Sequence, residues 1–382
     1  MAPERLPEPL LEPLLELPLD TPALVLDLDA MDGNRAVLAA SARQAGIGLR
    51  PHAKTHKSAA LARLQMADGA VGLCCAKLGE AEVLADAGIG DLLVTSPLAG
   101  ARKLARLAAL HARRPGLTVV VDSPEQADAL AAALAGGREP LAVLIDVDVH
   151  PVRGRTGVTG IPMALETARR VRAAASALSL RGVQGYAGHV QHIPGFAERR
   201  QGAADAASVL RATRDALAAQ GHPCPIVTGG GTGTFAIDPR FGLYTDLQPG
   251  SYLFSDVEYD AVDLTGDGRR PFRNALFVLA QVVSANHPGI ATVDAGSKTF
   301  PLDGPMPLVA AGAPPGAVYE PAGDEFGRVV LPDGAAAPRT GERILFVVPH
   351  CDPTINLHDA FHCTRGGMLA GSMPIEARGR AD

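Results

Sequence analysis

Apolar and polar positions alternate in two different ways along the chain, and the change between them falls near residue 271. Before that point, short apolar runs are separated by longer segments rich in Ala, Leu and Arg. Eight of the runs have the length and residue content of β-strands. They occupy residues 47–54, 72–77, 91–96, 117–122, 141–149, 180–190, 225–230 and 247–255, and a further strand is predicted earlier, at residues 23–28.

The segments between these runs repeat their apolar residues with a helical spacing. The clearest helical segments are residues 31–44, 80–87, 101–112, 123–134, 164–178 and 197–219. Regular alternation of strand and helix predicts an α/β fold with a parallel sheet, and eight strands close naturally into a (β/α)8 TIM-type barrel. A doubly wound open sheet would account for the same strand count.

Residues after 271 follow the second pattern, in which short strands are separated by turns rich in Gly and Pro. Strands are predicted at residues 275–283, 290–294, 327–331 and 342–348, with little sign of helix between them. We therefore expect a mainly β C-terminal domain after the barrel.

The composition narrows the class of protein. The 382 residues are 47% hydrophobic and 20% charged, which is ordinary for a globular enzyme, and a net charge of -6 offers no basic surface for nucleic acid. Five cysteines form an odd, unpatterned set that favours a reducing compartment. Neither a signal peptide nor an apolar stretch of roughly 20 residues is visible. We expect a soluble, cytoplasmic protein that binds neither nucleic acid nor membranes.

One basic stretch stands out at the end of the first barrel strand, where residues 49–57 read Leu-Arg-Pro-His-Ala-Lys-Thr-His-Lys. If this stretch is extended, His52, Lys54 and His56 share one face. Crowding by cationic or apolar neighbours would lower the pKa of Lys54, as an amine requires to form a Schiff base with a carbonyl compound. A solvated basic loop explains the stretch equally well.

A glycine-rich turn follows the seventh barrel strand, where residues 228–234 read Thr-Gly-Gly-Gly-Thr-Gly-Thr. Such a turn can expose several backbone N–H groups that bind a phosphate, although glycines also make ordinary tight turns. The spacing matches neither of the common nucleotide-binding motifs, so a small phosphorylated cofactor is favoured. A reactive lysine and a phosphate site at one barrel mouth together indicate pyridoxal phosphate (PLP) and an enzyme acting on an amino acid.

A His-x-Asp pair, His350 and Asp352, lies in the β domain. On an extended segment both side chains would point to one face, and imidazole with carboxylate suits Mn, Zn or another divalent ion. A hydrogen-bonded pair in a turn is the alternative. Two ligands are too few for a closed structural site, so a bound metal would keep positions for water or substrate.

In combination, the motifs resemble the D-threonine aldolase / D-serine dehydratase family, PLP enzymes of fold type III with an alanine-racemase-like fold. The resemblance runs from residue 21 to the C-terminus. It is carried by residues 51–57, 155–157, 186, 191–192, 229–233, 250–252 and 350–357. It implies a homodimer and three parts: residues 1–29, whose strand joins the β domain; the PLP-binding barrel at 30–265; and the metal-binding β domain at 266–382.

The resemblance also implies a role for each site residue. Lys54 would bind PLP covalently and His192 would act as the catalytic base, while His350 and Asp352 would bind the metal. Arg155 would lie near the PLP ring and Tyr186 near the cofactor. The other predicted cofactor-binding residues lie at the ends of the last two barrel strands; they are Thr228, Gly230, Gly231, Thr232, Gly250, Ser251 and Tyr252.

Within this family the choice is between two reactions, cleavage of a carbon–carbon bond and elimination of water. The resemblance implies that a His-x-Cys pattern with zinc is typical of the dehydratases, whereas a His-x-Asp pattern with manganese or a similar ion is typical of the aldolases. This chain has the second pattern, with Asp352. It also carries Gln191 and His192 after Tyr186, as the aldolases do, but it departs from the family pattern at His189 and Phe326. Those departures bear on substrate preference more than on reaction class.

We therefore expect a PLP-dependent D-threonine aldolase that uses a divalent metal (Mn, or Mg, Co or Zn) and cleaves D-β-hydroxy-α-amino acids to glycine and an aldehyde. A metal-dependent dehydratase of D-serine or D-threo-3-hydroxyaspartate is the nearest alternative. A non-catalytic PLP-binding protein and a barrel metal hydrolase without PLP are the others.

Overall fold

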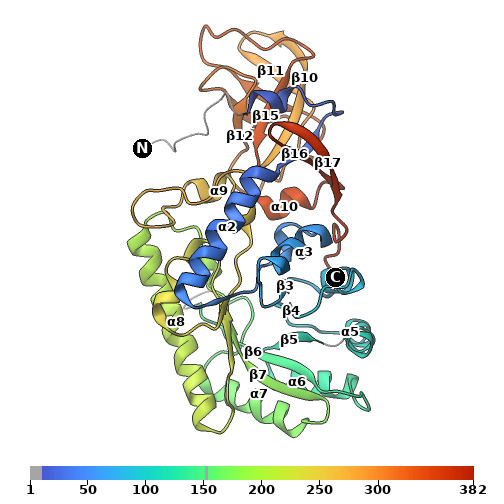
Figure 1. The fold of residues 1–382 in the computed structure, drawn as a ribbon, viewed down its shortest axis with the longest axis vertical. Helices are drawn as coiled ribbons and strands as arrows, with labels where there is room; N and C mark the ends of the chain where they lie inside the picture. The colour runs from blue at the N-terminus through green and yellow to red at the C-terminus, as the bar shows by residue number, and fades with distance from the viewer. Residues whose placement is uncertain (1–10, 115, 151–153) are drawn as a thin grey trace.

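The computed structural model describes residues 11–114, 116–150 and 154–382, so the first ten residues of the predicted N-terminal segment 1–29 lie outside this range. The described residues form a β-rich part and a barrel part, drawn at the top and bottom of Figure 1. Helix α2 (Leu28–Ala45) runs from one part to the other, and the short helix α10 (Cys351–Ile355) lies where they meet.

The barrel part contains eight parallel strands. From the second strand onward each is hydrogen-bonded to the next along the chain, and the first is paired to the last. They are β2 (Gly48–Leu49), β3 (Leu73–Cys75), β4 (Leu92–Val94), β5 (Leu117–Val121), β6 (Leu141–Asp146), β7 (Leu178–Gly185), β8 (Ile226–Gly229) and β9 (Asp246–Leu247). Between β2 and β3 the ring closes through a parallel bridge, in which the N–H of Cys74 donates to the carbonyl of Pro51 at 2.8 Å. The predicted barrel is therefore confirmed over the open sheet.

All eight barrel strands end earlier than the sequence predicts, and two of them keep only two residues. The predicted strand 47–54 stops at Leu49 and the predicted strand 247–255 stops at Leu247, because one-turn 3₁₀ helices follow at Ala53–Thr55 and Ser251–Leu253. Similar turns follow β7 and β8. These turns form one rim of the barrel, the rim at which its strands reach their carboxyl ends.

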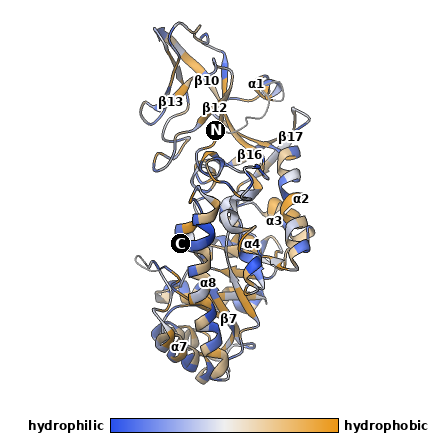
Figure 2. Ribbon diagram, turned by 90° about the vertical axis from the view of Figure 1, so that its left-hand side faces the viewer, coloured by the Kyte–Doolittle hydropathy of each residue, from blue (hydrophilic) through white to orange (hydrophobic). Residues whose placement is uncertain are grey.

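Helices cover the outside of the barrel: α3 (Ala59–Ala67), α4 (Leu78–Asp86), α5 (Ala101–Arg113), α6 (Pro124–Ala133), α7 (Ile161–Ala173) and α8 (Phe196–Ala219). In α8, buried residues recur every three or four positions, as at Ala203, Ala207, Leu210 and Leu217. Helices α2, α7 and α8 accordingly show both hydrophilic and hydrophobic stretches in Figure 2. Each predicted helix is present, with ends shifted by a few residues.

The β-rich part is a nine-stranded sheet that combines β1 (Ala23–Asp27) with β10 (Leu276–His287), β11 (Ile290–Val293), β12 (Leu308–Ala311), β13 (Val318–Pro321), β14 (Gly327–Val330), β15 (Arg343–Val347), β16 (Ala360–Arg365) and β17 (Met368–Pro374). Strand β1 lies between β10, to which it is antiparallel, and β16, to which it is parallel. The four strands predicted after residue 271 are present. Strand β17 was missed because nearly all of it is exposed, so it shows no alternation of apolar and polar positions.

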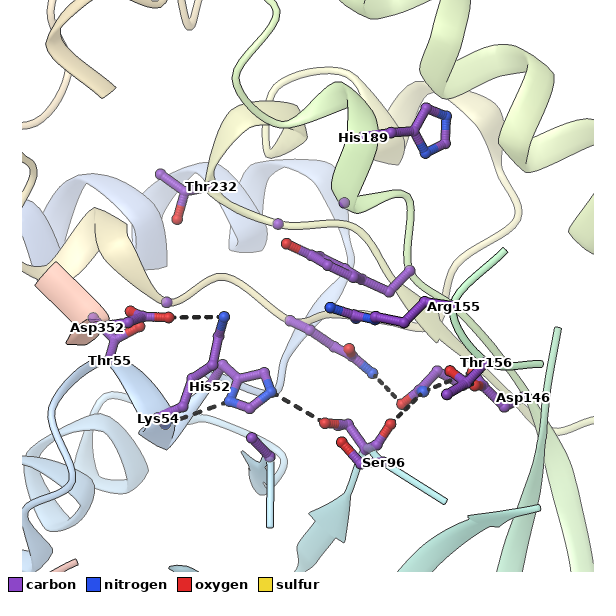
Figure 3. A pocket seen from close by; sticks show the side chains of 18 of the residues that line it. His52, Lys54, Thr55, Ser96, Asp146, Arg155, Thr156, His189, Thr232 and Asp352 are labelled. Atoms are coloured by element: carbon purple, nitrogen blue, oxygen red, sulfur yellow. Dashed lines mark hydrogen bonds and ion pairs between the residues drawn. The ribbon is translucent and has the colours of Figure 1, made fainter. Parts of the chain in front are cut away.

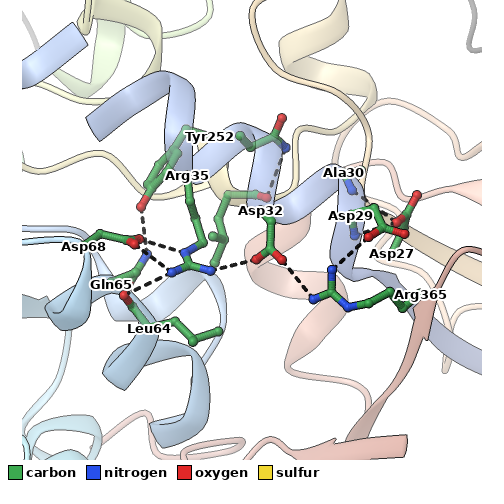
Figure 4. A network of polar contacts seen from close by, with 12 residues as sticks. Asp27, Asp29, Ala30, Asp32, Arg35, Leu64, Gln65, Asp68, Tyr252 and Arg365 are labelled. Carbon is green, nitrogen blue, oxygen red and sulfur yellow. Dashed lines mark hydrogen bonds and ion pairs between the residues drawn. The ribbon is translucent and has the colours of Figure 1, made fainter. Parts of the chain in front are cut away.

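A network of charges joins the two parts through helix α2 (Figure 4). The guanidinium of Arg35 contacts the carboxylates of Asp32 and Asp68 at 2.7 Å each. From β16, Arg365 contacts Asp29 at 2.8 Å and Asp32 at 2.9 Å. Exposed ion pairs contribute about 0–1 kcal/mol each, so this network mainly fixes the direction of the helix. Among the described residues, no helix combines the length and apolar content needed to cross a membrane.

A fully buried arginine fixes the loops at the barrel rim. Arg199, near the start of α8, donates from Nε to the carbonyl of Gly233 at 2.7 Å. Its Nη atoms donate to the carbonyls of Ile193, Pro194 and Asp263. One side chain therefore satisfies four carbonyls from three segments, and burial lowers the pKa of its guanidinium.

Replacing this arginine should destabilise the protein. In Arg199→Ala the four carbonyls lose the arginine as a donor. The carbonyl of Pro194 keeps the N–H of Asp263, but each buried carbonyl left without a partner costs about 1–3 kcal/mol. We expect the free energy of unfolding, measured from urea denaturation followed by circular dichroism, to fall by about 3–5 kcal/mol. The matched control is Arg200→Ala on the same helix, where the side chain is exposed and the change should stay within about 0.5 kcal/mol. Equal effects of the two substitutions would contradict the assignment.

Candidate active site

A cavity of about 820 Å³ lies at the carboxyl ends of the barrel strands. This is the rim at which barrel enzymes carry their active sites, and the volume lies within the range of small-ligand pockets. Ten of the predicted site residues line it: Lys54, Arg155, Tyr186, His192, Gly231, Thr232, Gly250, Ser251, His350 and Asp352. Eight come from the barrel and the last two from the β-rich part, so the cavity is built by both.

Lys54 lies in the 3₁₀ helix Ala53–Thr55, not in a strand. Its side chain points into the cavity, and its Nζ lies 2.7 Å from Oδ2 of Asp352 (Figure 3). His52 also lines the cavity, whereas His56 is fully buried with its Nε2 3.1 Å from Oε1 of Gln65. The prediction that the two histidines share a face with Lys54 is therefore wrong, because a 3₁₀ turn repeats every three residues.

The charge state of Lys54 also differs from the prediction. The carboxylate of Asp352 raises the pKa of Lys54, and this attraction outweighs the burial of the amine, which acts in the opposite direction. Burial alone would raise the pKa of Asp352, but the charges of Lys54 and His350 hold it below its usual range. Burial, assisted by the charge of Lys54, lowers the pKa of His52 to about 3 and keeps that ring neutral. Lys54 and Asp352 therefore form an ion pair.

The turns after β8 and β9 form a second feature, the glycine cradle, made of Gly231, Thr232, Gly250 and Ser251. A Cβ at Gly231 would lie 2.5 Å from Oε1 of Gln191, and one at Gly250 would lie 2.2 Å from Oγ1 of Thr55. Both positions therefore require glycine.

The cradle also offers hydrogen-bond donors to the cavity. Thr232 and Ser251 open two 3₁₀ helices, where N–H groups have no partner within the helix. Within the part of the chain that the structure describes, the N–H groups of Thr232, Gly250 and Ser251 donate to no other group. Three such donors facing a cavity suit a phosphate group.

Three predicted cofactor residues are not brought to the cavity: Thr228, Gly230 and Tyr252. The hydroxyl of Thr228 donates to Asp246 at 2.6 Å, and the hydroxyl of Tyr252 accepts from the side chain of Gln65 at 3.1 Å. Gly230 has a φ of 66°, and a Cβ there would lie 2.2 Å from Oδ2 of Asp238. These residues support the glycine cradle from behind.

The far end of the cavity holds a buried carboxylate that the sequence did not single out as a site residue. Asp146 ends strand β6 and accepts hydrogen bonds from Thr156 at 2.8 Å and from the side chain of Gln184 at 2.9 Å. Burial raises the pKa of Asp146 to about 6, although these hydrogen bonds act in the opposite direction. In Figure 3, Arg155 lies between this end and the end occupied by Lys54, with His189 on the opposite wall.

His192 follows the 3₁₀ helix Gly188–Val190 that comes after β7. Its ring packs on Tyr259 at 4.6 Å between centroids and lies 6.3 Å from the ring of His350. Burial lowers the pKa of His192, against the charges of Glu258 and Asp256, so a neutral ring is favoured. The carboxylate of Glu258 lies beside both histidines. Sequence reasoning missed it because no spacing connects residue 258 to residues 192 or 350.

His350 and Asp352 both face the cavity, although not on the extended segment that the sequence predicted. His350 precedes α10 and Asp352 lies in its first turn, while the buried Cys351 points elsewhere and its N–H donates to Asp256 at 2.9 Å. Oδ1 of Asp352 is buried and makes no well-formed hydrogen bond to a described residue, although the hydroxyl of Thr55 interacts with this carboxylate. Among the described residues, no group of three or more His, Cys, Asp or Glu is arranged to hold a metal. The structure therefore brings His350 and Asp352, the two predicted metal ligands, to one cavity.

Comparisons with known proteins give related descriptions for both parts of the chain. The family model "Alanine racemase, N-terminal domain" matches residues 26–257, and a serine dehydratase domain model matches residues 275–364. The D-threonine aldolase of an Arthrobacter species is 37% identical over 94% of this chain and 93% of that protein. The 3-hydroxy-D-aspartate aldolase of Paracoccus denitrificans is 36% identical over 95% and 93% respectively.

Solved structures show similarity to the same two kinds of enzyme, an aldolase and a dehydratase. The D-threonine aldolase from Filomicrobium marinum has a TM-score of 0.90 and 41% identity, and the match covers 95% of this chain and 97% of that one. A D-threo-3-hydroxyaspartate dehydratase variant in a metal-free form has a TM-score of 0.84 and 29% identity, with coverage of 94% and 98%. The chain therefore belongs to the D-threonine aldolase / D-serine dehydratase family of the alanine-racemase-like fold, as its combined motifs predicted.

Proposed function

We propose that the protein is a PLP- and divalent-metal-dependent aldolase that cleaves D-β-hydroxy-α-amino acids such as D-threonine to glycine and an aldehyde. The observation that carries this proposal is the meeting of Lys54 and Asp352, 2.7 Å apart, in one cavity with His192. A covalent cofactor site, a metal ligand and a base then lie within reach of one small substrate. The similarity to aldolases of D-threonine and 3-hydroxy-D-aspartate supports the same reaction.

The residues of the cavity fit PLP. Lys54 has an amine that can hold the aldehyde of the cofactor, and the N–H groups of the glycine cradle suit its phosphate. Arg155 and Tyr186 line the space where its ring would lie. When bound, PLP supplies a sink for the electron pair released as the Cα–Cβ bond breaks.

The residues also fit a divalent metal. Oδ1 of Asp352 is buried and makes no well-formed hydrogen bond to a described residue, and the ring of His350 lines the same cavity. Imidazole and carboxylate donors suit manganese, which we propose as the native ion. When bound, the metal would lower the pKa of the substrate hydroxyl and orient it.

His192 is the group that we propose as the base. Its ring lines the cavity, and burial lowers its pKa, so it is neutral and can accept a proton at neutral pH. The β-hydroxyl gives its proton to His192 and becomes the carbonyl of the aldehyde as the Cα–Cβ bond breaks. The α-carbon then gains a proton, and the substrate atoms are fully accounted for as glycine and aldehyde.

The products test the reaction. Incubation of the PLP-loaded protein with D-threonine and Mn²⁺ should give equimolar acetaldehyde and glycine, measured by chromatography. Removal of the metal with a chelator should abolish the products, and a series of Mn²⁺, Mg²⁺, Co²⁺ and Zn²⁺ ranks the ions. Formation of 2-oxobutanoate and ammonia would instead establish a dehydratase.

Substitution of the base should separate catalysis from cofactor binding. His192→Ala should lower kcat by about 10²–10⁴-fold, the usual contribution of general base catalysis, while the absorbance of covalently bound PLP stays. Lys54→Ala is the opposite control, because it should remove that absorbance together with the activity. A near wild-type kcat in His192→Ala would exclude His192 from the role.

We also propose that the protein is a cytoplasmic homodimer. All five cysteines are free, in keeping with a reducing compartment, and most of the exposed large apolar side chains lie in the β-rich part, including Phe326, Leu357 and Met368. Light scattering after size-exclusion chromatography should give close to twice the chain mass of 39.4 kDa. The mass of a single chain would contradict the dimer.

A further inference from the structure

One carboxylate lies between the two histidines to which different roles were assigned. Oε2 of Glu258 is 3.5 Å from Nε2 of His192 and 3.3 Å from Nδ1 of His350. His192 comes from the barrel and His350 from the β-rich part. Glu258 therefore contacts a residue of each part beside the cavity.

The position of Glu258 is fixed by its backbone. It lies on the short helix α9 (Val257–Asp260), and its N–H donates to the carbonyl of Pro349, the residue before His350. Asp256 caps this helix and also accepts from the N–H of Cys351, the residue after His350. Hydrogen bonds on both sides of His350 thus hold it against the glutamate.

Glu258 lies behind the histidines and not in the cavity. His192 and His350 are among the residues that line the cavity, and Glu258 is not. Its Oε2 is buried and has no well-formed hydrogen bond to any described residue, and one nitrogen of each histidine ring lies 3.3–3.5 Å from it. A glutamate in this position can orient the histidines, but it does not face the substrate.

The buried oxygen decides which ring nitrogens carry hydrogen. Burying a carboxylate oxygen is costly unless N–H groups face it, so the ring nitrogens beside Glu258 must be the protonated ones. His350 then carries its hydrogen on Nδ1 and keeps Nε2 for a metal. His192 carries its hydrogen on Nε2 and keeps Nδ1 to accept a proton. The two contacts are longer than ordinary hydrogen bonds, as catalytic contacts often are before the substrate binds.

We propose that Glu258 is a positioning residue that fixes the tautomer and ring orientation of both His192 and His350, and so couples the base to the metal ligand. The roles of the two histidines rest on the proposed function, whereas the contacts with Glu258 do not. Outer carboxylates that orient a metal-binding histidine typically contribute 10–100-fold to metal affinity or activity. Here one carboxylate serves both functions.

The test combines metal affinity with kinetics in the PLP-loaded protein. In Glu258→Gln the side chain keeps its shape but loses its charge, so Mn²⁺ affinity, measured by electron paramagnetic resonance of the free ion, should fall about 10–100-fold. With saturating Mn²⁺, kcat for D-threonine should fall at least tenfold at an unchanged KM. The absorbance of bound PLP and the Tm should stay as in wild type. The matched control is Glu82→Gln on α4, whose carboxylate faces Arg106 of α5, and it should change none of these values.

A second measurement needs no variant of the glutamate. ¹⁵N NMR of histidine-labelled wild-type protein, with the His192 signals assigned by their absence in His192→Ala, should show hydrogen on Nε2 of His192 and on Nδ1 of His350. The opposite tautomer at either ring would overturn the proposal. Wild-type Mn²⁺ affinity and wild-type kcat in Glu258→Gln would overturn it as well.

The two proposals can fail separately. If the wild-type protein releases no acetaldehyde but Glu258→Gln binds Mn²⁺ more weakly, the aldolase assignment fails and the positioning role toward His350 stands. If the wild-type protein is an aldolase and the Glu258 variant matches it in both measurements, only the positioning role fails.

Discussion

The contact between Lys54 and Asp352 is the interaction on which the rest of the site depends. It joins a 3₁₀ turn at the rim of the barrel to the first turn of a helix in the β-rich part, at 2.7 Å. The side chains of Lys54 and Asp352 are 39% and 16% exposed, and such partly buried ion pairs contribute little net stability because desolvation offsets their attraction. The pair therefore acts mainly as a geometric constraint, since Lys54 and Asp352 can both be satisfied only when the two parts are correctly placed.

Several features of the structure maintain that placement. Helix α2 spans both parts and is held by Arg35 on the barrel side and by Arg365 on the β side. Arg199 secures the loops that carry His192 and the glycine cradle. None of these residues touches the cavity. The precision of the site thus comes from residues around it.

The barrel could be predicted from the sequence because its strands and helices are long, regular and strongly apolar on their buried faces. Short elements could not be predicted in this way. The 3₁₀ turn Ala53–Thr55 looked like the end of a strand, so His56 was assigned to the wrong face, and the pKa of Lys54 was expected to fall because its partner lies far along the chain. Glu258 belongs to no motif in the sequence. Its importance comes only from contacts with residues that are distant in sequence, which periodicity does not reveal.

The position of β1 has a consequence for how the molecule is made. This strand is the first described element of the sheet, yet its two neighbours, β10 and β16, begin at Leu276 and Ala360. At the roughly 5–20 residues per second of synthesis, β1 leaves the ribosome tens of seconds before its second neighbour. The barrel can close during that interval, whereas the nine-stranded sheet must wait for β16 and β17. Asp352 therefore cannot reach Lys54 until the β-rich part has been made, well after the strands of the barrel.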